Sequence, residues 1–382
     1  MKGTVIALLI SIMSFGLNAQ NGWIETFANA QQGLSVIEFD NGYNIAGFKG
    51  QDNDNILYLH INENGVEEQR YIYSDFNSNH IYDKSINKLL LTNDGGLLVS
   101  TYNNEASIDT FTKLLKYNFN GELDWSKQYY QTSEEQEITA LAEFENGYYV
   151  GINERNPNYA LSYISSINNQ GEINWATTLD DSLKVEHIRL DTNENPIALC
   201  SRLVTLNNNS YTTYFLAKLD TLGNLTALDI IEFDYDDFVV EISDVSIDES
   251  NQIYITGNIL LQNNTDASVQ MFAGKLGWNG FFTSIGAYKF NDASFTNGLS
   301  IVNGWDNGYL VAGVYGDLDN PNSYKSFYLK LRDNGLSDWS SNDAAYDYGY
   351  RLNDIILTSD SSYLFIGPVS YTHLTLPTKP SG

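Results

Sequence analysis

The sequence predicts an all-β protein, a β-propeller of four-stranded antiparallel blades, and three observations carry this prediction. A two-part phrase returns about every 50 to 57 residues, and each copy holds four short runs of strand character. No long segment has apolar residues at helical spacing, so helices should be rare. We expect seven blades, the last of them incomplete, and an eight-bladed ring is the alternative.

The first half of the phrase is a turn followed by a strand that often ends in Gly, as in Asp306-Asn307-Gly308-Tyr309 before Gly313. The first residue after this turn recurs in steps of 54, 51, 49, 56, 56 and 54, at Tyr43, Leu97, Tyr148, Ile197, Ile253, Tyr309 and Tyr363. A second Gly turn keeps the same period, at Gly65, Gly121, Gly171, Gly223, Gly280 and Gly335. Two independent markers with one period indicate a repeated structural unit.

The strands are read most clearly in the second copy, where they are bounded by Asn, Asp and Gly. We expect them at residues 86–92, 97–101, 110–117 and 123–130. Asn-Gly and Asp-Gly supply the positive φ angles that tight hairpin turns need. Four antiparallel strands at this period describe a propeller blade, and a flat solenoid would use shorter repeats.

The segment Asn21–Phe27 resembles the fourth strand of the later copies. Pairing it with the last copy would close the ring and remove exposed sheet edges, so we expect it there. The last blade would then lack its third strand. Trp125, Trp175 and Trp339 each lie four residues after a second-turn glycine. We expect these rings to pack at the seams between neighbouring blades.

Both ends of the chain differ from the repeats. Residues 1–19 have a positive charge at Lys2, an apolar stretch and a small-residue cleavage site, which predicts a signal peptide, with a retained anchor as the alternative. Residues 20–367 form the propeller. Residues 368–382 are proline-rich, lack acidic residues and resemble translated sequencing adaptor, so we interpret them as a non-native tail; a native disordered tail is the alternative.

With phrases such as residues 306–313 and 331–339, the chain resembles a broad group of exported bacterial propeller proteins. The resemblance covers residues 21–367 and implies a β-propeller from a Gram-negative bacterium, secreted or held at the outer cell surface by the type IX route. It says little of activity, because the shared residues are turn and packing positions. The Gly-to-Trp spacing also resembles quinone-dependent dehydrogenase propellers, but Cys200 is the only cysteine and cannot form their cysteine pair.

No catalytic residue is assigned from the sequence. The histidines His60, His80, His187 and His373 are isolated, and the spacings of a zinc site, a nucleophile elbow or a phosphate loop are absent. Sites in propellers can be assembled from several blades, so an enzyme stays an alternative. We favour a protein that is not an enzyme.

Connections between the second and third strands are rich in Asn and Asp and should fall on one face of the ring. They supply the ligand-binding candidates Asp52, Asp54, Asn104, Asn156, Asn208, Asn264, Asp317 and Asp319. Asp52, Asp54, Asp317 and Asp319 are also candidate Ca²⁺ ligands, and no other cofactor is expected. The simpler interpretation is that Asn and Asp are good loop residues that keep an exported protein soluble.

The formal net charge of −28 argues against nucleic acids and anionic membrane surfaces as partners. We expect a monomer without membrane insertion. The leading hypothesis is an exported binding or adhesion module for a polysaccharide or a surface protein. The alternative is an extracellular carbohydrate-active hydrolase or lyase whose site lies at the channel mouth.

Overall fold

The computed structural model describes residues 6–13, 24–27, 32–49, 55–73, 84–103, 111–129, 135–155, 161–179, 182–206, 209–233, 238–261, 268–290, 293–304, 306–342 and 353–370. Every regular element in these ranges is a β-strand, as the repeat pattern predicts. The same ranges contain no helix with the length and apolar character needed to cross a membrane.

The strands form seven four-stranded units, which we call blades 1 to 7. Blade 1 contains β3 (Gln32–Phe39), β4 (Gly42–Lys49), β5 (Asn55–Asn62) and β6 (Glu67–Tyr73). Blade 2 contains β7 (Lys84–Leu91), β8 (Leu97–Asn103), β9 (Phe111–Tyr117) and β10 (Leu123–Tyr129). Blade 3 contains β11 (Glu135–Phe144), β12 (Gly147–Arg155), β13 (Ser162–Asn168) and β14 (Ile173–Thr178). Blades 4 and 5 contain β15 (Lys184–Leu190), β16 (Pro196–Leu206), β17 (Asn209–Leu219) and β18 (Leu225–Ile230); and β19 (Phe238–Ile247), β20 (Ile253–Leu261), β21 (Val269–Leu276) and β22 (Phe282–Tyr288). Blades 6 and 7 contain β23 (Phe295–Asn303), β24 (Tyr309–Asp317), β25 (Asn320–Leu331) and β26 (Ser337–Asn342); and β27 (Asp354–Leu357), β28 (Tyr363–Ser370), β1 (Ile6–Met13) and β2 (Ile24–Phe27).

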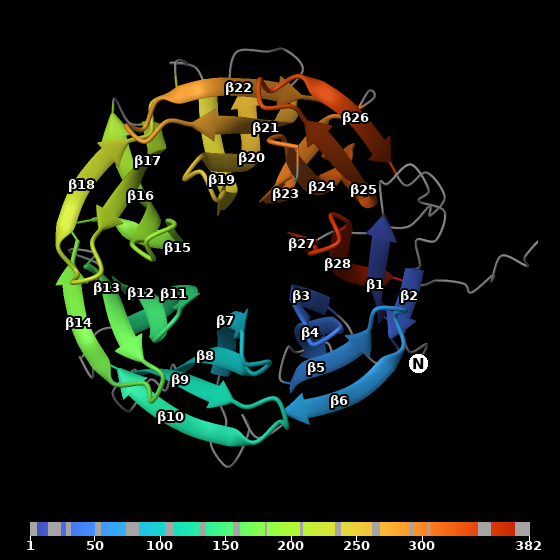
Figure 1. Cartoon of the computed structure of the whole chain (residues 1–382). Coiled ribbons are helices and arrows are strands. Elements are labelled where there is room, and N and C mark those ends of the chain that lie inside the picture. Colours follow the sequence, from blue (N-terminus) through green and yellow to red (C-terminus); the bar gives the residue numbers. More distant parts are fainter. Residues whose placement is uncertain are drawn as a thin grey trace, which may run out of the picture.

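The blades stand side by side around an open centre, each with its first strand innermost (Figure 1). Five blades are separate four-stranded sheets, and blades 5 and 6 share one eight-stranded sheet through a single parallel pair, Val269 with Phe295. Strands within each blade pair antiparallel. The prediction of a β-propeller of four-stranded blades is therefore confirmed.

Blade 7 closes the ring with two segments from the start of the chain. Its sheet order is β2-β1-β28-β27, so β2 is the outer strand, as the likeness of residues 21–27 to a fourth strand predicts. The third-strand position, expected to be empty, is occupied by β1, which pairs with β28 from Ile6 opposite Ser370 to Met13 opposite Tyr363. β1 lies within the predicted signal peptide, and that assignment stays a prediction. The suspect tail lies outside the described residues from residue 371 onward.

Each blade carries apolar side chains on both of its faces, so the hydrophobic core consists of layers between neighbouring blades. Between blades 7 and 1, Leu364 and Ile366 cluster with Val36 and Ile45. Between blades 3 and 4, Cys200 joins Val185 and Ala140 in a similar layer, fully buried and without a disulfide. Burial raises the pKa of the Cys200 thiol, which fits an inert core residue.

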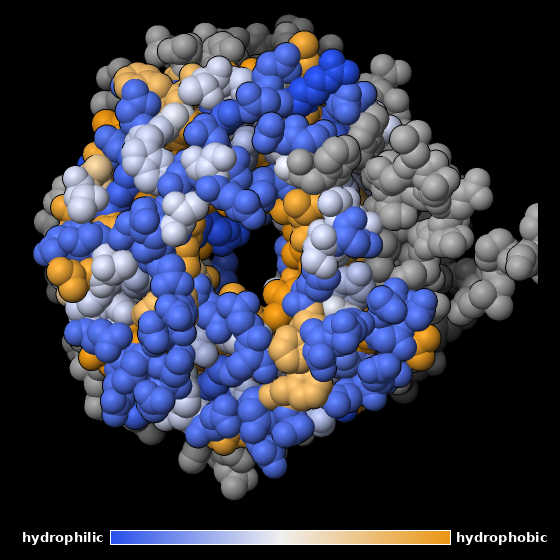
Figure 2. All heavy atoms as spheres, viewed as in Figure 1, coloured by the Kyte–Doolittle hydropathy of each residue, from blue (hydrophilic) through white to orange (hydrophobic). Residues whose placement is uncertain are grey.

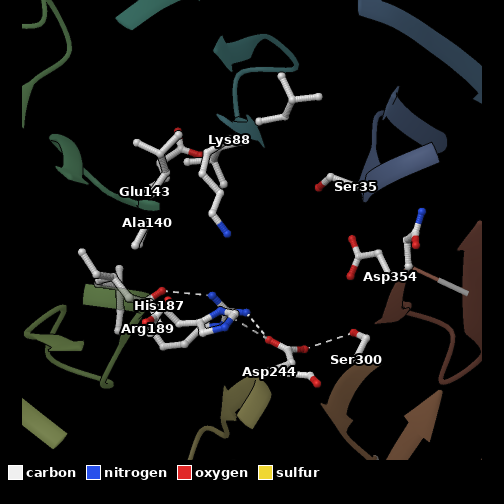
Figure 3. Close-up of a pocket in the computed structure, with 18 of the residues that line it drawn as sticks. Ser35, Lys88, Ala140, Glu143, His187, Arg189, Asp244, Ser300 and Asp354 are labelled. Atoms are coloured by element: carbon white, nitrogen blue, oxygen red, sulfur yellow. Dashed lines mark hydrogen bonds and ion pairs between the residues drawn. The ribbon is translucent and has the colours of Figure 1, made fainter. Parts of the chain in front are cut away.

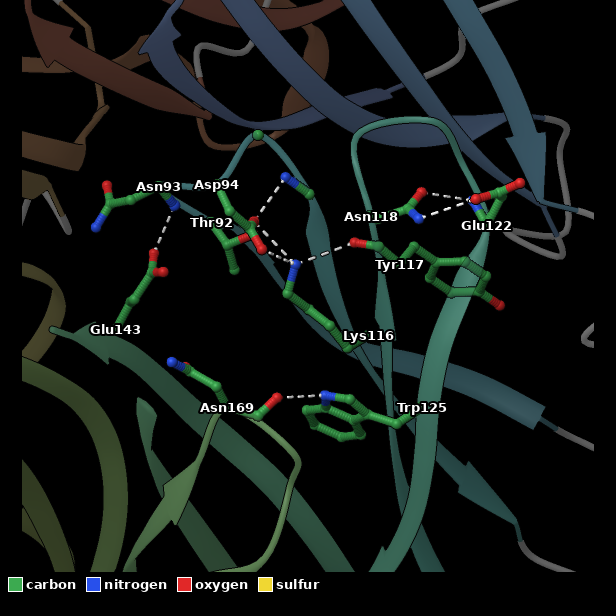
Figure 4. Close-up of polar contacts among 12 residues, drawn as sticks. Thr92, Asn93, Asp94, Lys116, Tyr117, Asn118, Glu122, Trp125, Glu143 and Asn169 are labelled. Carbon is green, nitrogen blue, oxygen red and sulfur yellow. Dashed lines mark hydrogen bonds and ion pairs between the residues drawn. The ribbon is translucent and has the colours of Figure 1, made fainter. Parts of the chain in front are cut away.

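At two outer seams the expected tryptophan contacts the next blade, whereas the side chain of Trp339 lies outside the described residues. Trp125 on β10 donates its indole N–H to the carbonyl of Asn169 in the next blade at 2.8 Å (Figure 4), and Trp175 does the same to Thr221 at 2.9 Å. The Trp125 ring lies over Gly171, whose φ is +74°, and a Cβ there would come within 2.8 Å of the ring. The glycine turn of one blade thus contacts the tryptophan of the preceding blade, which explains why both residues recur together in the repeat.

Candidate ligand site in the central channel

One position recurs on all seven inner strands and faces the central channel. In each blade it lies opposite the fourth residue after the first turn, for example Ser35 opposite Ala46 and Asp354 opposite Ile366. In blades 1 to 6 it directly follows a β-bulge, which turns the side chain toward the channel. We call these residues the channel ring: Ser35, Lys88, Ala140, His187, Asp244, Ser300 and Asp354.

All seven residues of the channel ring line one cavity of about 590 Å³. This volume is in the range of small-molecule sites. Figure 2 shows the channel open on this face, with hydrophobic residues toward β27 and β3 and hydrophilic residues toward β15. The lining itself combines apolar residues such as Leu89, Leu141 and Ile188 with polar and charged ones, an arrangement that suits a ligand with both kinds of surface.

Asp244 ties blade 5 to its neighbours on both sides (Figure 3). Its Oδ1 accepts a hydrogen bond from Arg189 Nη2 at 2.7 Å, and its Oδ2 accepts from the backbone N–H of Ile301 at 3.0 Å and from Ser300 Oγ at 3.1 Å. Its own blade contributes the N–H of Val245 at 2.8 Å. Because both oxygens are fully engaged, this carboxylate holds the inner strands together and orients Arg189.

Asp354 makes the same bridge between blades 7 and 1. Its Oδ2 accepts from the N–H of Val36 at 3.1 Å, and its Oδ1 accepts from the N–H of Ile355 at 2.9 Å. No cation among the described residues forms an ion pair with Asp354, and burial together with the nearby Asp244 raises its pKa to about 7, against the two N–H bonds that lower it. Asp354 is therefore a carboxyl group that can give or take a proton near neutral pH.

His187 is a neutral side chain in this cavity. Burial lowers its pKa to about 3, although the carboxylate of Asp244, with Nδ1 and Oδ1 at 3.9 Å, works in the opposite direction. Neutral imidazole can accept a proton or a hydrogen bond, so His187 has the chemical form of a base or of a polar contact.

Lys88 points into the open centre from β7 (Figure 3). Its backbone is fixed at the bulge by the buried Ser100, whose Oγ accepts from the N–H of Lys88 at 2.9 Å. Its ammonium has no hydrogen bond or ion pair with any residue that the structure describes. Burial, followed by the positive charge of Arg189, lowers the pKa of Lys88. A partly desolvated ammonium without a counter-ion costs free energy, and a bound anionic ligand could offset that cost.

The candidates chosen from the sequence lie elsewhere. Asp317 and Asp319 are exposed at the hairpin turn between β24 and β25, where Asp317 Oδ1 accepts from Ser294 Oγ at 3.1 Å and from the N–H of Asp319 at 3.2 Å. Asp52, Asp54, Asn104, Asn156, Asn208 and Asn264 lie outside the described residues. Within the described ranges no group of three or more His, Cys, Asp or Glu side chains gathers where a metal could bind.

Sequence reasoning missed the channel ring, although a signal for it exists. Counted from the first residue after the first turn, the ring residue lies eight or nine positions earlier, as Ser35 does before Tyr43 and Asp244 before Ile253. In blade 4 the equivalent marker is Pro196, because the N–H of Asp191 bonds the carbonyl of Asn195 as Asp248 bonds Gln252. Placing the marker at Ile197 instead hides the alignment of His187 with the ring.

Comparison with protein-family models finds no match, and comparison with curated proteins finds none either. Among solved structures, an ulvan lyase, which is a polysaccharide lyase, was determined bound to a saccharide of glucuronic acid and sulfated rhamnose. It shares 9% identity over 82% of this chain and 86% of that chain, with a TM-score of 0.55.

A mutant of the Synechocystis apocarotenoid oxygenase shares 9% identity over 92% of this chain and 91% of that chain, with a TM-score of 0.50. An endo-arabinase from Bacteroides thetaiotaomicron shares 12% identity over 69% and 94%, with a TM-score of 0.36. The lyase and the oxygenase have unrelated activities on similar scaffolds, so these two likenesses show the fold alone. The site has to be interpreted from its own residues.

Proposed function

We propose that this protein is an exported β-propeller that binds an extracellular polysaccharide, with the saccharide entering the central channel. One observation carries the proposal: seven equivalent positions place an amine, an imidazole, two carboxyl groups and two hydroxyl groups around a single open cavity. Hydroxyl-rich ligands need several such donors and acceptors together with apolar surface, and the lining supplies both. The ulvan lyase neighbour, a protein solved with a saccharide, is compatible with this role for the fold.

The proposal places recognition in the channel, whereas the candidate residues expected from the sequence lie in the connecting loops. Asp317 and Asp319 satisfy part of their hydrogen bonding within their own turn, which fits the simpler interpretation of these residues as loop formers. The export signal and the outer-surface location remain part of the proposal, supported by the predicted signal peptide.

A glycan array followed by calorimetry tests the proposal. Ser35 is half-buried and its side chain lines the cavity, so Ser35→Trp should fill the channel and abolish binding. The matched control is Ser337→Trp, at an exposed position of β26, which should bind as the unaltered protein does. Thermal unfolding of both variants checks the fold. Equal binding by Ser35→Trp and the unaltered protein would place the site outside the channel.

A second candidate function is a polysaccharide lyase, which the protonation states of the ring favour. In β-elimination a base removes the proton from the carbon beside the uronate carboxylate, the C–O bond of the glycosidic linkage breaks, a C=C bond forms, and the departing oxygen takes up a proton. Neutral His187 could accept the first proton, and Asp354 could supply the second. A hydrolase using paired carboxylates is less favoured, because Asp244 and Asp354 are both held by backbone N–H groups.

The two candidates differ in their product. A lyase would give an unsaturated uronate that absorbs in the ultraviolet, together with new reducing ends, when incubated with a polyuronate. A binding module would retain the polymer intact. Loss of ultraviolet product in His187→Ala with retained binding would support the lyase.

A further inference from the structure

We infer that the ligand of the channel is an acidic saccharide whose carboxylate or sulfate binds the ammonium of Lys88. This inference rests on the proposed function and adds the chemical class of the ligand. It also names Lys88 as the residue that selects this class.

The first step concerns the other charged groups that line the cavity. Asp244 is paired with Arg189, and Asp354 accepts two backbone N–H groups. Glu143 accepts from the N–H of Asn93 at 2.7 Å, and Glu186 accepts from Ser201 Oγ at 2.5 Å (Figure 4 shows the Glu143 contact). Each carboxylate of the cavity therefore has at least one donor within the protein.

The second step concerns the cations. Arg189 is satisfied by Asp244 and by the carbonyl of Ile188 at 3.0 Å. Among the charged groups of the cavity in the described chain, Lys88 alone has no partner. An ammonium with three donors and no acceptor is costly when it is partly desolvated, and an anion repays that cost better than a neutral hydroxyl group.

The third step concerns contrast with the rest of the molecule. A chain with a formal charge of −28 repels anions in general. Elsewhere its buried lysines meet carboxylates: Lys116 contacts Asp94 at 2.8 Å, Lys218 contacts Asp229 at 2.6 Å, and Lys330 contacts Asp306 at 2.5 Å. Lys88 departs from this pattern at the place where the channel is open, which points to a counter-ion brought by the ligand.

Matched glycans give the sharpest test, because the charge can be removed while the backbone stays the same. The probes are polygalacturonate, alginate and chondroitin sulfate, each beside its methyl-esterified or desulfated form, with neutral arabinan and xylan. We expect at least one acidic polymer to bind at least tenfold more tightly than its neutralised form. Binding of the acidic polymer should also weaken with added salt.

Two variants locate the effect. Lys88→Met keeps the length of the side chain and removes the charge, and should weaken binding of the acidic polymer about tenfold and binding of the neutralised form by much less. Lys184→Met, at an exposed position on β15 outside the cavity lining, carries the same charge change and should bind as the unaltered protein does. The methylene carbon signals of Lys88 in NMR spectra should move with glucuronate and remain still with glucose.

The outcomes separate the inference from the proposed function. If acidic and neutralised polymers bind alike, or only arabinan or xylan binds, the inference is overturned and channel binding of a polysaccharide stands. If Lys88→Met and Lys184→Met weaken the acidic polymer equally, the anion is held by diffuse charge and not by Lys88. If no glycan of the panel binds, both ideas fail.

Discussion

The backbone N–H of Val36 donates to the carboxylate of Asp354 across 318 positions of sequence, at 3.1 Å. This bond joins the innermost strands of the first and last blades and is repeated between blades 5 and 6, where the N–H of Ile301 donates to Asp244 at 3.0 Å. In both places the channel carboxylate of one blade accepts a hydrogen bond from a backbone N–H in the inner strand of the next blade. Ring closure depends on this contact as well as on the apolar layer around Leu364.

Removing the Asp354 carboxylate should destabilise the ring closure. Asp354→Ala leaves the N–H groups of Val36 and Ile355 without their acceptor, and an orphaned buried donor costs about 1–3 kcal/mol of unfolding free energy. Urea unfolding measures the change. Asp338→Ala, which removes only a surface ion pair with Arg332, is the control and should cost at most about 1 kcal/mol. Equal losses in the two variants would show that the bridge contributes nothing to closure.

Two groups of the channel, Asp354 and His187, should make the unfolding free energy depend on pH in opposite directions. The pKa of Asp354 is raised to about 7, so the folded state holds a proton that the unfolded state releases, and this contribution falls as pH rises from about 4 to about 7. The pKa of His187 is lowered to about 3, so its contribution rises with pH between about 3 and 6.5.

Asp354→Asn isolates the first of these effects, because asparagine does not titrate. The midpoint of thermal unfolding of the variant, minus that of the unaltered protein, should increase between about pH 4 and pH 7 and level off above pH 7. The increase reflects relief of a carboxylate that must ionise while buried. A difference that stays constant over this range would mean that Asp354 is ionised throughout.

Two glycine turns at the outer seams have nearly the same backbone conformation but different surroundings, so their alanine variants can be compared. Gly171 and Gly335 have φ angles of +74° and +77°, but a Cβ at Gly171 would lie 2.8 Å from the Trp125 ring, while one at Gly335 would lie 3.6 Å from Ser284. Both alanine variants should lose about 1–2 kcal/mol from the left-handed backbone. Gly171→Ala should lose about 1–3 kcal/mol more through overpacking, which denaturant unfolding can measure. Similar losses would indicate that the tryptophan moves aside without cost.

The fold could be predicted because each blade repeats local chemistry. Turn glycines with positive φ and the Trp125 spacing are fixed by contacts that recur in every copy or in the next one, and so they leave a period in the sequence. The completion of blade 7 was only half predicted: the fourth-strand pattern of residues 21–27 located β2, but pairing of β1 with β28 has no local signature, since any apolar strand fits that position.

The candidate site could not be predicted, because it uses a position that the repeat leaves free. The channel ring holds Ser, Lys, Ala, His, Asp, Ser and Asp in turn, so no residue type is common to all copies. Lys88 and His187 stand in different blades, and each looks like an ordinary strand residue in its own. Variable turn lengths add a shift of one residue, which only the pairing of Pro196 with Leu190 resolves. Function here depends on differences between copies, whereas the sequence pattern reports their similarities.

The ion pair of Lys116 and Asp94 leads to a last prediction, that removing one partner costs more unfolding free energy than removing the other. The Lys116 side chain is 3% exposed and donates to both Asp94 oxygens, at 2.8 and 2.9 Å, and to the carbonyl of Tyr117 (Figure 4). The Asp94 side chain is 57% exposed. Although burial alone would raise it, the pKa of Asp94 is lowered by hydrogen bonds from Lys116 and Thr92.

Removing either partner breaks the same ion pair, but the group left behind meets a different environment. Asp94→Ala leaves a buried ammonium with one carbonyl and should cost about 2–3 kcal/mol. Lys116→Met leaves an exposed carboxylate that water can solvate, in a site filled by an apolar chain, and should cost less than about 1 kcal/mol. Denaturant unfolding of both variants and of the double variant measures the asymmetry. The double variant should recover most of the loss in Asp94→Ala, since no buried charge remains, and failure to recover would show that Asp94 acts through its turn and not through Lys116.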